Sequence, residues 1–244
     1  MDPVKLIAAM RKFNVDVVEY AGWAKRSHGA LDGRIIMVHD SVTGHMTASR
    51  AANFCIAGRT DLKGPLYECL IAADGRAHLI ANGVTWNAGM GDDDRLQQAR
   101  RGLMPLDREL NRPDENNVNG NAISHGIAMV TYGAGPYTAN QIEVCARVCA
   151  AYGFAEGWGE YTAGSMIGHG EFSPRKIDPA HDMGQLRTRT HNLILGRDEI
   201  WHVVVTGDTL WSLARRYGRT VTDIRQLNRL TSDVIGIGWR LRVK

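Results

Sequence analysis

The chain has 244 residues, of which 44% are hydrophobic and 23% charged, and its formal net charge is +3. This length and composition suit one large domain, or a medium domain with a small appendage, and they exclude wholesale disorder, a collagen-like repeat and a coiled coil. No apolar run approaches the ~18–20 residues of a membrane span, and the apolar start Leu6–Met10 is too short for a signal peptide. Four cysteines without a Cys-x-x-Cys pair are typical of a protein made in a reducing cytosol.

Charge is distributed unevenly along the chain. From Leu186 onward there are 11 Lys and Arg against 5 Asp and Glu, whereas the preceding residues hold 18 against 21. The tail is therefore basic and the body mildly acidic, so we expect the two parts to meet different surfaces.

The first half of the chain predicts helices followed by strands. Apolar residues at roughly helical spacing predict one or two short helices from Val4 to Lys25. Large apolar residues predict a buried strand over Arg34–His39, which places His39 at the strand end. Leu66–Ile71 and Ala77–Ile80 are expected to be strands joined by an Asp-Gly turn, and Gly126–Val130 is expected to be a further strand.

The middle of the chain is more polar and ends in a capped helix. The acidic run Asp92–Asp94 predicts the start of a solvated helix, and the Asn-rich residues 111–117 predict a surface loop. Thr138 is placed to cap a helix from Ala139 to Tyr152, with Gly153 just past its end. On the inward face of that helix, Cys145 and Cys149 are interpreted as small core residues, with half of a metal site as the alternative.

The last 44 residues predict a separate unit with the order strand, helix, helix, strand, preceded by a polar linker at residues 197–200. The strand Trp201–Val205 leads to a helix over Thr209–Tyr217, and Thr220 with Asp223 forms a capping-box pattern for the second helix. Trp239–Val243 closes the unit as a strand. The expected core consists of Val203, Val205, Leu210, Leu213, Ile224, Leu227 and Leu241.

This tail resembles a LysM domain over nearly its full length. The resemblance rests on Trp201–Val205, on the segment TGDTLWSLA at residues 206–214 and on Leu227-Asn228. It implies binding of N-acetylglucosamine-containing glycans such as peptidoglycan, without a metal, in a shallow groove lined by Gly207, Asp208, Thr209 and Ile235. The alternative is a basic appendage that binds nucleic acid, which the lack of interleaved aromatic and basic residues disfavours.

The segment GHGEFSPRKIDP at residues 168–179 is similar to the zinc loop of the peptidoglycan-recognition-like N-acetylmuramoyl-L-alanine amidases, a family that includes small phage lysins. Weaker matches are the strand that ends at His39, Leu66–Gly75, Trp86–Gly89 and Ser124–Ile127. The resemblance implies an α+β fold, a mixed β-sheet flanked by helices. It predicts a zinc amidase catalytic domain at residues 1–196 and a small βααβ LysM domain at residues 201–244.

By the same resemblance, His39, His169 and Asp178 match the three zinc-ligand positions of the family. Two imidazoles and one carboxylate suit a catalytic Zn²⁺ that keeps one coordination position open. Glu171 is either an acceptor that holds the His169 imidazole or a solvent-exposed glutamate. The histidines that could replace a proposed ligand are His45, His78, His125, His181 and His191.

Lys176 matches the catalytic lysine of the family, whose ammonium can stabilise a tetrahedral oxyanion. Its partner is expected to be Tyr67, because the chain has Ala128 where some members have a glutamate; a tyrosine packed in the core is the alternative for Tyr67. Trp86 and Asn87 are expected to bind substrate, although Trp86 equally suits a core position.

Together the two resemblances predict a monomeric, Zn²⁺-dependent enzyme that cleaves the amide bond between N-acetylmuramic acid and L-alanine in bacterial peptidoglycan, without a nucleic-acid partner or a membrane span. The lack of a signal peptide favours a bacteriophage endolysin, which is made in the host cytoplasm and reaches the cell wall after holin-dependent release to lyse the host. The alternatives are a non-catalytic peptidoglycan-binding receptor and a cytosolic muropeptide-recycling amidase.

Overall fold

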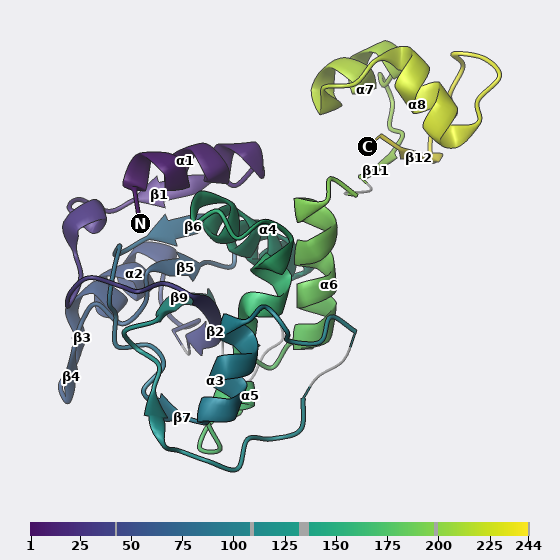
Figure 1. Cartoon of the computed structure of the whole chain (residues 1–244). Coiled ribbons are helices and arrows are strands. Elements are labelled where there is room, and N and C mark those ends of the chain that lie inside the picture. Colours follow the sequence, from purple (N-terminus) through teal and green to yellow (C-terminus); the bar gives the residue numbers. More distant parts are fainter. Residues whose placement is uncertain (42, 108–109, 132–136, 198–199, 244) are drawn as a thin grey trace. The chain divides into compact units, whose positions relative to one another are not determined.

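The computed structural model describes the chain except residues 42, 108–109, 132–136, 198–199 and 244. The described residues form two compact units, Met1–Leu195 and Gly196–Lys244 (Figure 1). Residues 198 and 199 of the expected linker 197–200 lie outside the described residues. Within the described part of the chain, no helix is long and apolar enough to cross a membrane.

A six-stranded mixed sheet forms the centre of the first unit. In spatial order its strands are β1 (Val17–Glu19), β6 (Ala77–Leu79), β5 (Cys69–Ile71), β9 (Ser124–Val130), β2 (Ile35–Ser41) and β10 (Met166–Gly168). Neighbouring strands run parallel except β5 and β6, which form an antiparallel hairpin. The α+β class with a mixed sheet is therefore confirmed.

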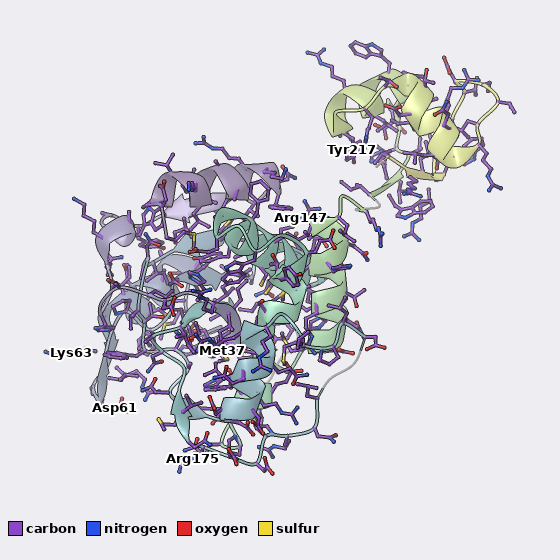
Figure 2. All side chains as sticks on the ribbon, in the orientation of Figure 1. Met37, Asp61, Lys63, Arg147, Arg175 and Tyr217 are labelled. Atoms are coloured by element: carbon purple, nitrogen blue, oxygen red, sulfur yellow. The ribbon has the colours of Figure 1, made fainter. Side chains whose placement is uncertain are left out.

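Helices cover both faces of this sheet (Figure 1). One face packs against α1 (Pro3–Lys12), α4 (Ala139–Ala155) and α6 (Met183–Ile194), and the other against α2 (Ala48–Ala57) and α3 (Asp93–Arg100). Because side chains alternate along a strand, β2 directs Ile36 and Val38 to the first face and Ile35 and Met37 to the second. His39 continues the second series, and Met37, which Figure 2 labels, is fully buried.

Short elements complete the first unit. They are η1 (Trp23–Lys25), β3 (Gly58–Arg59), β4 (Leu62–Lys63), β7 (Met90–Gly91), β8 (Val118–Asn119), η2 (Gly159–Ser165) and α5 (His169–Phe172). β3 and β4 form a two-stranded hairpin, and β7 and β8 form a second two-stranded antiparallel sheet. The side chain of Asp92 caps α3, so the acidic run starts a helix as predicted.

Of the one or two short helices expected from Val4 to Lys25, α1 and the short 3₁₀ helix η1 are present, but the residues of β1 between them form a strand instead of a helix. After α1, Asn14 has a φ of 55°, a left-handed conformation that a continuing helix cannot contain. The chain then enters β1, whose Val17 pairs with Ala77 of β6. Strand pairing with a distant segment therefore decides the structure of this part of the chain.

The helix after Thr138 begins where predicted, with a capping box formed by Thr138 and Gln141, but it does not stop at Gly153. A Cβ at Gly153 would lie 2.2 Å from Thr162, so this glycine permits close packing against η2 rather than ending the helix. Cys145 and Cys149 are fully buried in the hydrophobic core, as the first interpretation proposed.

The second unit has the predicted strand, helix, helix, strand order. β11 (Trp201–Val203) pairs antiparallel with β12 (Arg240–Arg242), and α7 (Leu210–Tyr217) and α8 (Val221–Asn228) lie between them in the chain. Capping boxes at Thr209 and Thr220 start the two helices. The buried core consists of Val204, Leu210, Leu213, Ala214, Ile224, Leu241 and Val243.

Part of the core predicted for this unit is wrong. Val203 and Val205 are 55% and 54% exposed, whereas Val204 between them is buried. All three valines fit a strand, so composition alone does not show which face of the strand is covered. Leu227 is only partly buried.

Candidate metal centre

His39 and His169 meet at the carboxyl ends of two adjacent parallel strands. His39 lies in β2, and β10 ends at Gly168, immediately before His169. The strand register pairs Gly168 with Val38, and each of these two residues is followed in the chain by a histidine. Both side chains are buried, with 1% and 5% exposure, on the sheet face covered by α2 and α3.

Asp178 completes a cluster of three potential metal ligands. Its Oδ2 lies 3.3 Å from His169 Nδ1 and 3.4 Å from His39 Nδ1, and the two Nδ1 atoms are 3.1 Å apart. Within the described ranges this is the one group of three or more His, Cys, Asp or Glu side chains that could hold a metal, with ligand atoms within 4.8 Å of one another. The alternative ligands His45, His78, His125, His181 and His191 are outside it.

The outer nitrogens of both imidazoles face oxygen acceptors. His39 Nε2 lies 3.3 Å from Asn87 Oδ1, and His169 Nε2 lies 3.1 Å from the backbone oxygen of Ala88. These acceptors favour the tautomer with a proton on Nε2, which leaves the lone pair of each Nδ1 directed toward Asp178. This is the arrangement that metal coordination through both Nδ1 atoms requires.

A hydrogen-bond network fixes the orientation of the Asn87 amide. Asn87 Nδ2 donates to Thr85 Oγ1 at 3.0 Å, and the Ser124 hydroxyl donates to Asn87 Oδ1 at 3.0 Å. The amide oxygen therefore points to His39. The role expected from sequence for Asn87, contact with substrate, stays a prediction, and the structure adds contact with a candidate ligand.

The electrostatics of the cluster suit a cation. Burial and the neighbouring His169 together lower the pKa of His39 to about 4, so the His39 imidazole is neutral at pH 7. Burial alone raises the pKa of Asp178, but its contacts with His169 and His39 outweigh burial and hold that pKa well below its usual range. Two imidazoles and an ionised carboxylate are a donor set that fits Zn²⁺.

A network around Asp40 anchors the loop that carries Asp178. The backbone N–H of Asp40 donates to Asp178 Oδ2 at 3.3 Å, and the Asp40 carboxylate accepts hydrogen bonds from the Tyr137 hydroxyl and from the backbone N–H of Ala180. Burial raises the pKa of Asp40 to about 6. Tyr137 lies 97 positions from Asp40, and no sequence pattern indicates this contact.

A cleft of about 820 Å³ opens onto the cluster. Its lining includes His169 and Asp178 together with all four other residues predicted for the site, Tyr67, Trp86, Asn87 and Lys176. The Tyr67 ring lies 5.2 Å from the His39 ring, measured between centroids. Trp86 is partly exposed and stacks on His28, so it forms part of the cleft wall rather than of the core.

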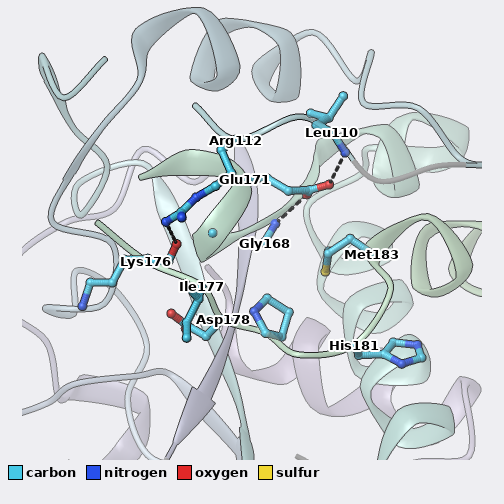
Figure 3. Close-up of a pocket in the computed structure, with 11 residues that line it drawn as sticks. Leu110, Arg112, Gly168, Glu171, Lys176, Ile177, Asp178, His181 and Met183 are labelled. Carbon is cyan, nitrogen blue, oxygen red and sulfur yellow. Dashed lines mark hydrogen bonds between the residues drawn. The ribbon is translucent and has the colours of Figure 1, made fainter. Parts of the chain in front are cut away.

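Tyr67 and Lys176 line the cleft from two separate segments of the chain. Tyr67 precedes β5, and burial raises the pKa of Tyr67 far above its ordinary value, so its hydroxyl keeps the proton and can donate a hydrogen bond. Lys176 is exposed on the loop that leads to Asp178. Figure 3 shows that loop, with the Lys176 side chain extending away from His181, and Arg112 donating to the Lys176 carbonyl oxygen at 3.2 Å.

Glu171 holds the turn from β10 into α5 and does not contact the His169 imidazole. Its carboxylate accepts a hydrogen bond from the backbone N–H of Gly168 at 2.9 Å and pairs with Arg187, whose Nη1 and Nη2 lie 2.8 and 3.0 Å from it. Figure 3 shows Glu171 reaching Gly168 and Leu110. Glu171 is buried, which contradicts the exposed alternative, and the fully buried Arg187 was not anticipated from the sequence.

The expected glycan-groove residues of the second unit have internal partners. The Asp208 carboxylate accepts hydrogen bonds from the Val205 backbone N–H at 2.8 Å and from His202 Nε2 at 2.7 Å. Thr209 caps α7, Gly207 has a φ of 91°, and Ile235 packs against the core. These side chains hold the shape of the loop, so we expect backbone groups, rather than these side chains, to contact a glycan here. Glycan binding itself stays a prediction.

Two family models match the chain. A model described as N-acetylmuramoyl-L-alanine amidase matches residues 30–181, a range that contains His39, His169 and Asp178. A model described as LysM domain matches residues 202–244.

Curated relatives match only about a fifth of the chain. The chain is 49% identical over 43 residues to a probable N-acetylmuramidase of Lactococcus lactis subsp. cremoris, a match that covers 18% of this chain and 10% of the relative. It is 50% identical over 42 residues to a probable endopeptidase p60 of Listeria grayi, covering 17% and 8%. The chain therefore spans about a tenth of the length of these relatives.

Two solved structures are similar to the chain at low identity. One is the endolysin N-acetylmuramoyl-L-alanine amidase LysCS from Clostridium intestinale, with 17% identity, a TM-score of 0.37, and coverage of 63% of this chain and 80% of that one. The other is the Staphylococcus aureus hydrolase AmiA in complex with its ligand, with 13% identity, a TM-score of 0.42, and coverage of 79% and 91%.

Proposed function

Because the chain belongs to the N-acetylmuramoyl-L-alanine amidase family and carries a C-terminal LysM domain, we propose that it hydrolyses the amide bond between N-acetylmuramic acid and L-alanine in bacterial peptidoglycan. The observation that carries this proposal is the convergence of His39 Nδ1, His169 Nδ1 and the Asp178 carboxylate, the last two of which belong to residues that line the cleft. Those three side chains would hold a Zn²⁺ ion. When bound, zinc supplies a Lewis acid and lowers the pKa of water toward ~7, which an unactivated amide requires.

The other residues of the cleft have separate roles in this proposal. Asn87 and the Ala88 carbonyl hold the two imidazoles in the tautomer that binds metal. Lys176 neutralises the negative charge that develops on the carbonyl oxygen of the lactyl group, and the protonated Tyr67 donates a hydrogen bond to the same oxygen or orients the attacking water. The scissile bond lies along the cleft, with Trp86 against the substrate.

The LysM domain serves as a wall-binding module in this proposal. Two weak sites on one chain bind a polymer more tightly than either site does alone, because the second binding event becomes intramolecular. Residues 1–196 as the catalytic domain and 201–244 as the wall-binding domain are the boundaries we propose.

The finer biological role we propose is that of a phage endolysin acting as a monomer, which accumulates in the host cytoplasm and reaches the wall after holin-dependent release. A test is to produce the protein in bacterial cytoplasm with and without a holin: lysis that depends on the holin supports this role. Lysis without a holin, or its absence in both cultures while the purified protein cuts walls, contradicts it.

Product analysis tests the activity directly. Purified peptidoglycan treated with the protein should release new N-terminal L-alanine without new reducing sugar ends, because an amidase leaves the glycan strand intact. A non-catalytic receptor would bind the same walls without releasing alanine. A muropeptide-recycling amidase would cut small soluble muropeptides and leave intact walls unchanged.

A further inference from the structure

The two-stranded sheet of the LysM domain has one covered face and one open face. Val204, Leu241 and Val243 point into the domain core and are buried. The residues that alternate with them point outward, and they include Trp201, Val203 and Val205, with exposures of 45%, 55% and 54%. Three half-exposed apolar side chains on one small face indicate a binding surface.

Arginines interleave with these residues across the strands, Trp201 included, so the expectation from the sequence that aromatic and basic residues do not interleave is wrong for this face. In the strand register Arg242 is opposite Trp201, and Arg240 is opposite Val203. The Arg240 guanidinium lies 5.1 Å from the centroid of the Trp201 ring, within the range of a cation–π contact. We call the set Trp201, Val203, Val205, Arg240 and Arg242 the outer sheet face.

The outer sheet face is distinct from the expected glycan groove. The groove residues lie in the loop before α7 and in the loop around Ile235, where the Trp239 indole packs over Gly236 and a Cβ on Gly236 would be 2.8 Å from it. Four of the five residues of the outer sheet face lie on the strands themselves, and Val205 follows β11. Two copies of this face would bring arginines against arginines, so charge disfavours self-association through it.

We propose that the outer sheet face binds the surface of an anionic phospholipid membrane. A tryptophan and two valines can enter the interfacial layer, while the arginine stems lie along the apolar surface and the guanidiniums reach lipid phosphates. The positive charge of the arginines complements the negative charge of the lipid phosphates. The exposed apolar side chains favour a lipid surface over a purely ionic polymer, because such a polymer offers them no apolar contact. The proposal does not depend on the amidase activity, because it uses no residue of the cleft.

Vesicle co-sedimentation of the full chain tests the proposal. The protein should pellet with vesicles that contain equal parts of phosphatidylglycerol and phosphatidylcholine, and remain in solution with phosphatidylcholine alone. Arg240→Glu should weaken binding roughly tenfold, because it removes an attractive charge and adds a repulsive one. Trp201→Ala should also weaken it, and this loss should persist when salt screens the charges.

The matched control is Arg229→Glu. Arg229 follows α8 and is exposed, so this variant makes the same charge change outside the outer sheet face. It should retain binding within about twofold. Peptidoglycan binding and the circular dichroism spectrum of each variant establish that the LysM domain is folded.

Three outcomes would overturn the proposal. The first is no binding to anionic vesicles by the folded wild-type protein. The second is an equal loss of binding for Arg229→Glu and Arg240→Glu, which would mean that overall charge alone attracts the chain. The third is binding of inorganic polyphosphate or duplex DNA, but not vesicles, through the same residues, which would assign the face to a polyanion.

Discussion

The Nδ1 atoms of His39 and His169 lie 3.1 Å apart, although the residues are separated by 130 positions in the chain. Parallel pairing of β2 with β10 produces this contact, because the register places the residue after Gly168 beside the residue after Val38. A metal ion at this place would be coordinated by the two nitrogens together. The register of the sheet therefore positions the two histidines for metal binding.

Replacing Asn87 should weaken zinc binding without removing a ligand. In Asn87→Ala the His39 Nε2 loses its acceptor, so the imidazole is no longer held in one tautomer and orientation. We expect zinc affinity to fall about 10- to 100-fold, measured by competition with a chelator, with activity recovering at high zinc concentration.

The matched control for this prediction is Asn116→Ala, because Asn116 lines the same cleft and has no hydrogen bond to His39 among those of the described residues. Equal losses of zinc affinity in both variants would mean that Asn87 does not position His39.

Removing the Lys176 ammonium should slow the chemical step and leave the metal in place. Lys176→Ala is expected to lower kcat about 10²- to 10³-fold, because the charge on the carbonyl oxygen loses its cationic partner. Zinc stoichiometry should stay unchanged. The control is Arg175→Ala, which removes the neighbouring exposed positive charge; Figure 2 labels Arg175 at the edge of the unit. This variant should keep near-normal kcat. A comparable loss of kcat in Arg175→Ala would mean that the two charges act through general electrostatic attraction of the substrate.

Breaking the buried ion pair between Arg187 and Glu171 should destabilise the first unit. Arg187→Met leaves the Glu171 carboxylate buried without its charged partner, and the expected loss of unfolding free energy is about 3–5 kcal/mol. Adding Glu171→Gln should recover part of the loss, because a neutral amide costs less to bury. Urea denaturation measures the stability of the single and the double variant. An Arg187→Met chain as stable as the parent chain would contradict a stabilising role for the ion pair.

The pair of His125 and Glu68 predicts how stability depends on pH. Burial alone lowers the pKa of His125, but Glu68, at 2.7 Å, and Glu156 outweigh burial and raise that pKa to about 9. The folded state therefore holds this proton more tightly than the unfolded state, whose histidine pKa is about 6.5. The stabilisation is complete below pH ~6.5 and is lost as the pH rises through about 9, a change of roughly 3 kcal/mol.

Urea unfolding between pH 6 and pH 10 checks this dependence. The parent chain should lose stability across that interval, and His125→Gln should be less stable at pH 6 but show a smaller decline. The same decline in both proteins would assign the pH dependence to other groups.

Local features of the fold could be predicted from the sequence, and long-range contacts could not. Thr138, Thr209 and Thr220 start their helices as expected, because each cap depends on residues three positions away. The pairing of β1 with β6 was missed, because strand pairing depends on a partner some 60 positions away and no periodicity identifies it. The exposed Val203 was missed for a related reason, since packing decides which strand face is covered.

The candidate site shows the same division. His39, His169 and Asp178 came from a resemblance, because ligands so far apart in the chain have no diagnostic spacing. Asn87 was singled out as a substrate contact, and its hydrogen bond to His39 appears only when β2 and the segment after Thr85 lie together. The Arg187 contact with Glu171 likewise depends on packing between α6 and α5.

Zinc titration of the metal-depleted chain by calorimetry tests the central claim most directly. We expect one tight site per chain, and loss of that site in His39→Ala, in His169→Ala and, with weaker effect, in Asp178→Asn. If all three variants bind one zinc ion with the affinity of the parent chain, these side chains do not form the metal centre.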